Sequence, residues 1–185
     1  MRARIDANFS PPHAMFVGGV RSGKTNLAGE WLEARAENPV YVATCDPRDP
    51  ETMARVVRHR ESRGERWRTL ESRLNLSSDL ESFIDSERLR GAGVLIDCMS
   101  MWLANALEAD LSREKIFSAL SGLFGLIENL RLPAALVSAE CGLGFAPMNA
   151  LARRYGDLLG EINQYCAARC ASVYFVSCGL LLPLK

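Results

Sequence analysis

Residues 18–25 read Gly-Gly-Val-Arg-Ser-Gly-Lys-Thr, and this stretch decides the fold. It matches the pattern Gly-x-x-x-x-Gly-Lys-Thr, whose glycines let the backbone close around an anion with successive N–H groups pointing inward. The short apolar run before it, residues 14–17, predicts a buried strand. Apolar residues recur at helical spacing from Leu27 to Leu32, so a helix is expected to begin in the loop.

Each residue type in this stretch has a task in binding a nucleoside triphosphate. The positive end of the following helix would face the phosphates. Lys24 can reach the outer phosphates as a point charge, and the Thr25 hydroxyl can ligate Mg²⁺. A glycine-rich turn with a surface lysine is the alternative interpretation. The predicted triphosphate contacts are Gly18, Gly19, Val20, Arg21, Ser22, Gly23, Lys24 and Thr25.

Short apolar runs alternate with helical periods along the rest of the chain. The expected strands are residues 40–44, 67–71, 94–96, 134–137 and 173–176. The expected helices are residues 51–63, 99–109, 113–130 and 149–168, and one that starts at the capping-box pattern of residues 78–81. This alternation is typical of an α/β fold with a buried, mostly parallel sheet. We predict a three-layer P-loop fold in which residues 13–185 form one domain after a short extension, residues 1–12.

An aspartate follows one of these expected strands directly. Asp97 ends the apolar run of residues 94–96. A carboxylate at the tip of a parallel strand near a phosphate loop is where such proteins hold their metal, directly or through water. We therefore predict that Thr25 and Asp97 bind Mg²⁺. The alternative is a strand-end aspartate that caps the next helix.

Charge and cysteine usage narrow the class of protein. The chain has 22 acidic and 22 basic residues, and this balance predicts neither a nucleic acid nor an anionic membrane as partner. No apolar run approaches the length of a membrane span, and the first ten residues lack the apolar stretch of a secretory signal.

The six cysteines form no Cys-x-x-Cys pair, which argues against a zinc site and against a disulfide framework. We interpret them as small, mostly buried residues of a cytoplasmic protein, and His13 as a surface residue.

The only other histidine lies in a dense basic cluster. The cluster comprises Arg55, Arg58, His59, Arg60, Arg63, Arg66 and Arg68. Residues four apart share a helix face, and a face of this charge would repel itself unless an anion sat there. A solvated basic surface is the alternative. A neutral imidazole can attack the α-phosphorus of a triphosphate and form a phosphoramidate, so His59 is a candidate nucleophile.

Ten separated segments together resemble one family, the bifunctional adenosylcobinamide kinase and adenosylcobinamide-phosphate guanylyltransferase of cobalamin biosynthesis. They are residues 18–25, 41–44, 53–60, 67–71, 97–98, 102–105, 137–144, 149–155, 160–164 and 179–185. The similarity runs from the first expected strand to the last residue. The phosphate loop alone is generic, whereas the histidine segment followed by Trp67-Arg68-Thr69 is specific.

The resemblance implies two reactions. In the first, the γ-phosphate of ATP or GTP passes to the hydroxyl on the aminopropanol arm of adenosylcobinamide. In the second, GTP guanylylates a histidine and releases pyrophosphate, and GMP then moves to the cobinamide phosphate. His59 occupies the position of that histidine, with Lys24 as the second catalytic residue. The same resemblance implies that the following residues contact the guanine nucleotide: Ala43, Thr44, Cys45, Arg60, Glu61, Ser62, Arg63, Glu71 and Asp97.

The resemblance also implies a homotrimer, with sites near the subunit contacts. Three features depart from the family pattern: Ala139 replaces the usual Asn, Met148 replaces the usual Glu, and residues 45–49 form an unusual stretch with two prolines nearby. We expect the first two changes to affect the corrinoid side rather than the nucleotide side. Two alternatives remain, another small-molecule kinase that uses only the loop and Asp97, and a nucleotide-binding regulatory subunit that transfers nothing.

Overall fold

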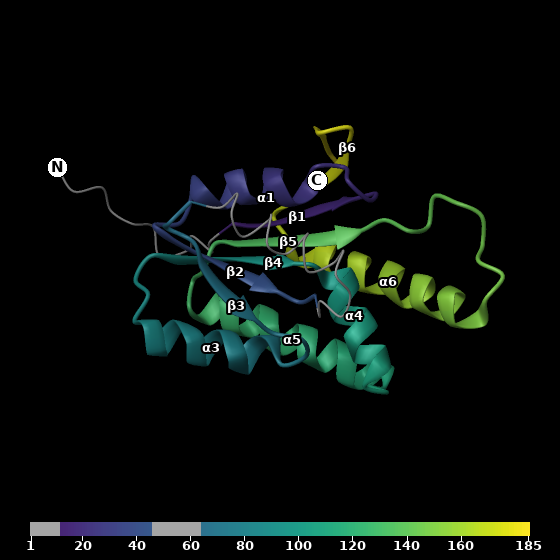
Figure 1. Ribbon diagram of the computed structural model, residues 1–185, viewed down its shortest axis with the longest axis horizontal. Helices are drawn as coiled ribbons and strands as arrows, with labels where there is room; N and C mark the ends of the chain where they lie inside the picture. Colours follow the sequence, from purple (N-terminus) through teal and green to yellow (C-terminus); the bar gives the residue numbers. More distant parts are fainter. Residues whose placement is uncertain (1–11, 46–63) are drawn as a thin grey trace.

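A seven-stranded sheet organises the part of the chain that the structure describes. A computed structural model describes residues 12–45 and 64–185. Its strands are β1 (His13–Gly18), β2 (Asn38–Ala43), β3 (Arg68–Glu71), β4 (Ala92–Asp97), β5 (Ala134–Ala139), β6 (Ser172–Ser177) and β7 (Leu180–Pro183). Their order across the sheet is β3-β2-β4-β5-β1-β6-β7 (Figure 1). Neighbouring strands are parallel except β6 and β7, which pair antiparallel.

Helices cover both faces of this sheet. Within the described ranges they are α1 (Lys24–Glu33), α3 (Leu76–Glu87), α4 (Met99–Glu108), α5 (Arg113–Asn129) and α6 (Ala150–Arg169). Helix α1 lies on one face, and the other four lie on the opposite face (Figure 1). This arrangement confirms the predicted α/β class with a mostly parallel central sheet between two helical layers.

The inner strands are apolar on both sides because helices cover both faces. In β1, Met15 and Val17 pack into the larger core beneath α3 to α6, whereas Ala14 and Phe16 pack into the smaller core beneath α1. Successive strand residues point to opposite faces, so a doubly covered strand needs a continuous apolar run. The run at residues 14–17 meets this requirement and confirms the first predicted strand.

Helix α5 shows how the helical period builds the larger core. Its buried residues are Ile116, Leu120, Leu123, Phe124 and Ile127, the set expected on one face. Each fully buried side chain of this kind contributes roughly 1.5–3 kcal/mol to folding. The Ser112 hydroxyl caps the helix by accepting from the Lys115 amide at 3.4 Å. Trp102 of α4 joins the same core and donates its indole N–H to the Leu74 carbonyl at 3.0 Å.

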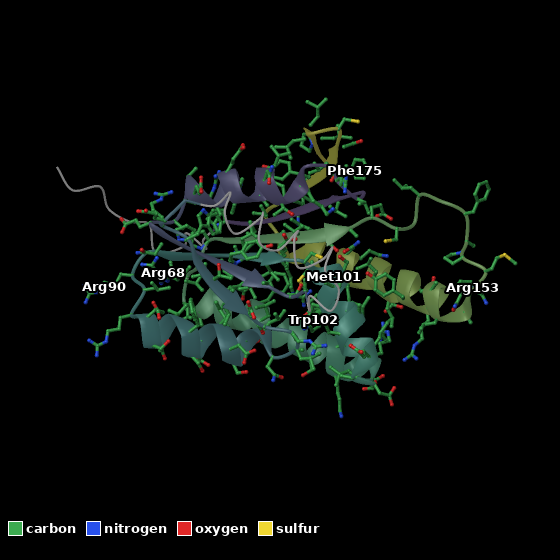
Figure 2. The ribbon with its side chains drawn as sticks, viewed as in Figure 1. Arg68, Arg90, Met101, Trp102, Arg153 and Phe175 are labelled. Carbon is green, nitrogen blue, oxygen red and sulfur yellow. The ribbon has the colours of Figure 1, made fainter. Side chains whose placement is uncertain are left out.

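The segment between β5 and α6 reaches away from the body of the protein (Figure 1). Asn149 caps α6 by accepting from the Leu151 amide at 2.7 Å. Arg153, at the outer end of α6 (Figure 2), donates to the Pro147 and Met148 carbonyls at 2.8 and 2.7 Å. The side chains of Phe145 and Met148 are fully exposed. The end of this segment is therefore tied to α6 rather than to the sheet.

Two local predictions were wrong. His13 is buried, not on the surface, because β1 begins at this residue and its ring packs edge-on against Phe124 at 6.5 Å. Helix α3 begins at Leu76 and not at the predicted capping box, because Asn75 precedes the first turn and accepts from the Asp79 amide at 3.0 Å. Ser78 instead lies inside that turn, where its hydroxyl donates to the Asn75 carbonyl.

The cysteines and the last strand also differ from expectation. Only Cys166 and Cys170 are buried, whereas Cys141 and Cys178 are exposed, so "mostly buried" was wrong. Strand β7 follows β6 in a tight hairpin that the sequence interpretation did not contain. The predicted helix at residues 51–63 lies outside the described residues. No helix among the described residues combines the length and apolarity that a membrane crossing requires.

Candidate functional site: a phosphate loop with a carboxylate beside it

The predicted phosphate loop joins β1 to α1, and two of its glycines are required by close neighbours. Gly18 lies against β6, where any Cβ would collide with the Val176 carbonyl. Gly23 adopts a φ of 96°, a conformation that L side chains rarely adopt, and its Cβ would lie 3.3 Å from Gly179 Cα. The Gly179 amide donates to the Ser22 carbonyl at 2.9 Å. The loop is therefore held from both of its ends.

The loop presents positive groups at the carboxyl edge of the sheet. Gly23 is the N-cap of α1 and makes no side-chain cap, and no acidic residue stands in the first helical turn. The positive end of the helix dipole is thus not neutralised by its own helix. Lys24 Nζ donates to the Gly19 carbonyl at 2.9 Å, which folds the ammonium back over the loop. The Ser22 hydroxyl is buried and has no hydrogen-bond partner among the described residues.

The strand-end aspartate meets the loop directly. Asp97 Oδ2 accepts from the Thr25 hydroxyl at 3.1 Å and from the Tyr41 hydroxyl at 2.7 Å. These residues come from β4, α1 and β2, which the sheet order brings to the same edge. The contact between Thr25 and Asp97 joins the two residues that the sequence predicted as magnesium ligands. The alternative role of Asp97 as a helix cap is not seen, since Cys98 is the N-cap of α4 and α4 has no side-chain cap.

A second network holds the tip of β4. The buried Thr44 hydroxyl donates to the Cys98 carbonyl and accepts from the Cys98 amide, both at 2.8 Å. The Thr44 amide donates to the Asp97 carbonyl at 3.2 Å, and the Thr44 carbonyl accepts from Asn105 Nδ2 at 2.8 Å. Every polar group of Thr44 is therefore bonded within the protein. This residue fastens the end of β2 to the end of β4, beside Asp97.

Cys98 and Cys141 lie near the loop, and their thiols are protonated at neutral pH. Burial raises the pKa of Cys98, and the neighbouring Asp97 carboxylate raises it further. Burial and the Glu140 carboxylate likewise raise the pKa of Cys141. Burial raises the pKa of Tyr155 to about 12, and its hydroxyl donates to the Ser100 carbonyl at 3.0 Å. None of these three groups provides an anionic nucleophile beside the phosphate loop.

The structure brings together only part of the predicted site. Ala43 and Asp97 are register partners at the ends of β2 and β4, and both lie at the same edge as the loop. Glu71 ends β3 at the outer side of the sheet and is exposed. Cys45 follows β2 and is half-buried. The remaining predicted contacts, His59, Arg60, Glu61, Ser62 and Arg63, lie outside the described residues.

Tyr41, Asn105 and Gly179 were not predicted as site residues. Each contacts a predicted residue that is distant in the sequence, so no local pattern singles it out. All three lie in segments that resemble the family, residues 41–44, 102–105 and 179–185, but the resemblance was not used to give them a role. A second signal was that Tyr41 stands two positions before Ala43. Residues two apart on a strand point to the same face, so a long side chain at this position can reach toward the strand end.

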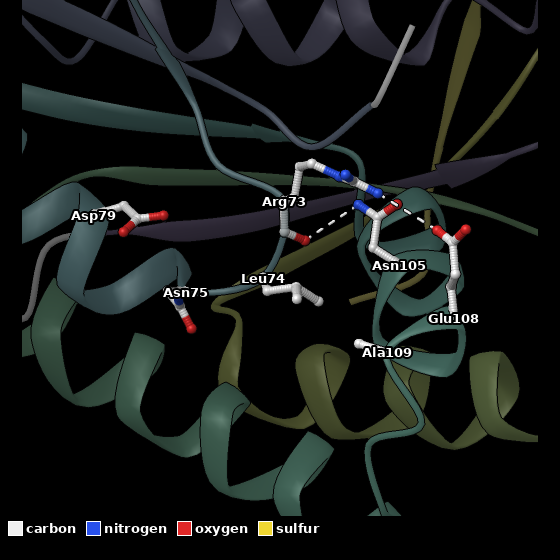
Figure 3. Close-up of a pocket in the computed structure, with 7 residues that line it drawn as sticks. All are labelled: Arg73, Leu74, Asn75, Asp79, Asn105, Glu108 and Ala109. Atoms are coloured by element: carbon white, nitrogen blue, oxygen red, sulfur yellow. Dashed lines mark hydrogen bonds and ion pairs between the residues drawn. The ribbon is translucent and has the colours of Figure 1, made fainter. Parts of the chain in front are cut away.

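A hollow lies beside this framework, on the side of α3 and α4 (Figure 3). Its volume is about 430 Å³, and it is lined by Arg73, Leu74, Asn75, Asp79, Asn105, Glu108 and Ala109. Asn105 Nδ2 donates to the Arg73 carbonyl as well as to Thr44, and Arg73 pairs with Glu108 at 3.4 Å. No predicted phosphate contact lines this hollow, so it is separate from the loop.

The donor set at the loop suits a hard divalent cation. Magnesium prefers oxygen ligands and commonly takes one or two from the protein, completing its shell with water and substrate phosphates. Thr25 and Asp97 supply such oxygens within 3.1 Å of one another. Among the described residues there is no cluster of three or more His, Cys, Asp or Glu residues that could hold a metal alone. This chain's residues therefore fit a metal that arrives with a nucleotide.

Comparison with known proteins places this geometry in a family. The bifunctional adenosylcobalamin biosynthesis protein CobP of Pseudomonas aeruginosa is 40% identical over 178 residues, covering 92% of this chain and 96% of that protein. The bifunctional adenosylcobalamin biosynthesis proteins CobU of Escherichia coli and Salmonella typhimurium are each 28% identical over 183 residues, covering 92% of this chain and 98% of those proteins.

A solved structure and a family-wide sequence pattern agree with these relatives. A KaiC-like protein from Pyrococcus horikoshii superposes with a TM-score of 0.55 at 16% identity, over 89% of this chain and 70% of that one, which shows a shared fold. The pattern of the family described as "cobinamide kinase / cobinamide phosphate guanyltransferase" matches residues 14–184. The phosphate loop, the strand-end aspartate and nearly the whole length of the chain fall within that match, and the chain therefore belongs to this family.

Proposed function

We propose that this chain catalyses both reactions for which its family is named, phosphorylation of cobinamide and guanylylation of cobinamide phosphate. The observation that carries the proposal is that three residues lie at the same edge of the sheet. Lys24 bonds back onto the phosphate loop there, and Thr25 donates to Asp97. The buried, unpartnered Ser22 hydroxyl supports it, because a bound phosphate would supply the missing partner. The adenosyl form of cobinamide is the proposed acceptor.

In the kinase step, the acceptor hydroxyl attacks the γ-phosphorus of ATP or GTP and loses its proton to solvent. The bond to the β-phosphate oxygen breaks, and ADP or GDP leaves. The loop amides and Lys24 stabilise the charge on the phosphoryl oxygens, which is the main contribution a protein makes to this reaction. Thr25 and Asp97 would hold Mg²⁺, which supplies further neutralisation of phosphate charge when bound. Ala43, Thr44, Cys45, Glu71 and Asp97 are the proposed guanine-nucleotide contacts among the described residues.

In the guanylyl step, an imidazole nitrogen of His59 attacks the α-phosphorus of GTP. The bond from this phosphorus to the pyrophosphate oxygen breaks, and GMP stays on the histidine as a phosphoramidate. A phosphate oxygen of cobinamide phosphate then attacks the same phosphorus, and the imidazole leaves. Thr44 contributes by holding the tip of β4, since its own polar groups are bonded within the protein.

Intact-protein mass spectrometry after incubation with GTP and Mg²⁺ tests the second proposed reaction, the transfer of GMP. The wild-type protein should gain the mass of one GMP, and acid should remove it. His59→Ala should remain unmodified, whereas His13→Leu, the matched change at the other histidine, should still gain GMP. Incubation with ATP and adenosylcobinamide tests the kinase half separately, because it should yield cobinamide phosphate with His59→Ala as well. A wild-type protein that stays unmodified with GTP would refute the guanylyl assignment.

The oligomeric state and location are part of the same proposal. We propose a homotrimer with sites near the subunit contacts, which light scattering on the purified protein would test by its molar mass. A cytoplasmic location suits an enzyme whose substrates are nucleoside triphosphates and whose described cysteines, including exposed Cys141 and Cys178, are all free thiols.

A further inference from the structure

Tyr41 and Asp97 form the shortest hydrogen bond to the site carboxylate. The Tyr41 hydroxyl donates to Asp97 Oδ2 at 2.7 Å, compared with 3.1 Å from the Thr25 hydroxyl. Both donors converge on the same oxygen. Among the described residues, no donor is assigned to the other oxygen, Oδ1. The carboxylate is thus anchored by one oxygen, and its second oxygen is left for another ligand.

The sheet register explains why a tyrosine reaches this carboxylate. Asp97 is the register partner of Ala43 on the neighbouring strand, and Tyr41 lies two residues before Ala43. Residues two apart share a face, so Tyr41 and Asp97 both point to the side of α1, the helix that carries Thr25. Tyr41 is the side chain with the length to span the remaining distance along the strand.

The ring of Tyr41 is itself fixed in place. It is 8% exposed and packs edge-on against Trp67, with ring centroids 6.5 Å apart. The Trp67 indole donates to Glu33 Oε1 at 2.6 Å, which ties this contact to the end of α1. A buried hydroxyl on a fixed ring gives the carboxylate one preferred orientation rather than several.

We infer that Tyr41 is a positioning residue for the metal site, holding Asp97 by Oδ2 so that Oδ1 is presented to a divalent cation that arrives with the nucleotide. This inference rests on the proposed metal role of Thr25 and Asp97. In this role Tyr41 acts through Asp97, whose Oδ2 accepts from its hydroxyl. Partners that orient a metal ligand typically change metal affinity by about 10- to 100-fold when they are removed.

The test measures Mn²⁺ binding to the full-length protein by electron paramagnetic resonance, with a non-hydrolysable ATP analogue present. Tyr41→Phe removes the hydroxyl and keeps the ring against Trp67. It should raise the Mn²⁺ dissociation constant about 10-fold while the analogue binds unchanged in EDTA. Tyr165→Phe is the matched control, since the Tyr165 ring packs against Phe117 and not near Asp97. In steady-state kinase assays, the KM for Mg²⁺ should rise and saturating Mg²⁺ should restore kcat.

A double-mutant cycle separates the possible outcomes. Asp97→Asn should weaken Mn²⁺ binding, and adding Tyr41→Phe to it should cause no further loss, because Tyr41 acts through Asp97. If Asp97→Asn weakens Mn²⁺ binding and Tyr41→Phe alone does not, the inference about Tyr41 is overturned and the metal site stands. If Asp97→Asn binds Mn²⁺ as the wild type does, the proposed metal site fails and the inference fails with it. If Tyr41→Phe weakens analogue binding in EDTA as much as it weakens Mn²⁺ binding, the tyrosine has a packing role. That result would also overturn the inference about Tyr41.

Discussion

The Gly179 amide donates to the Ser22 carbonyl at 2.9 Å, so the turn between β6 and β7 supports the phosphate loop from outside. Gly179 has a φ of 76°, and Gly23 of the loop lies close enough that an added Cβ would meet Gly179 Cα at 3.3 Å. The shape of the loop therefore depends on a turn near the other end of the chain.

Gly179→Ala should destabilise the protein by about 1 kcal/mol, because an L residue is strained at this positive φ. It should also weaken nucleotide binding, because the turn would shift against Ser22. Gly125→Ala is the matched control: Gly125 lies inside α5 with open space around it, and alanine there should stabilise by about 0.5–1 kcal/mol. Chemical denaturation and a nucleotide titration of both variants measure these effects. Equal stability of the two variants would contradict the strain at residue 179.

Thr44→Val should destabilise the protein by about 1–3 kcal/mol. The change removes the hydroxyl that bonds both the Cys98 amide and the Cys98 carbonyl, and it leaves those groups without that partner. Thr69→Val, on half-buried β3, is the control and should change stability by less than about 0.5 kcal/mol. Urea denaturation distinguishes them. A tolerated Thr44→Val would show that water replaces the lost hydroxyl.

Acidification should destabilise the protein through His13. Burial lowers the pKa of His13 below its usual value of 6.5, so the folded protein binds this proton less readily than the unfolded chain. The lowered pKa of His13 therefore makes a contribution to the free energy of unfolding. This contribution is fully present above pH 6.5 and declines as pH falls below that value. The nearby Glu128 carboxylate opposes the shift without cancelling it. Thermal melts between pH 7.5 and 5.5 should show a smaller decline for His13→Leu than for the wild type, and parallel declines would contradict the effect.

Lys24→Ala should weaken triphosphate binding about 10- to 100-fold, since hydrogen bonds to charged groups contribute roughly 1.5–3 kcal/mol. The folded structure should persist, because the Lys24 side chain makes one hydrogen bond among the described residues, to the Gly19 carbonyl. Lys115→Ala, at an exposed position of α5, is the charge-matched control and should bind as the wild type does. Calorimetric titration with a non-hydrolysable analogue measures both. Wild-type affinity in Lys24→Ala would argue that the lysine acts only after binding.

Much of the fold was predictable because its strands are buried on both faces. The runs at residues 14–17 and 94–96 carry continuous apolar side chains, and the loop of residues 18–25 carries its own pattern. Strand β7 was missed because its leucines are exposed and follow no alternation. His13 was assigned to the surface because prolines precede it, although the sheet already begins there.

The site was predictable only where its chemistry is local. Thr25 and Asp97 could be named from the pattern and from a strand end, but their contact depends on the sheet order. Tyr41 could not be singled out, because its partner lies on a strand far along the chain and their register is a product of folding. When helices separate two strands in the sequence, contacts between those strands produce no periodic pattern of residues.

The placement of β1 has a consequence for synthesis on the ribosome. β1 pairs with β5 on one side and with β6 on the other, and the loop that follows it is completed by the turn at Gly179. A nascent chain translated only as far as β4 therefore has the phosphate-loop residues and Asp97, but it lacks the two strands that flank β1 and the turn at Gly179. Nucleotide affinity should appear late in translation, after the hairpin of β6 and β7 has emerged, and such long-range pairing is a slow class of folding event.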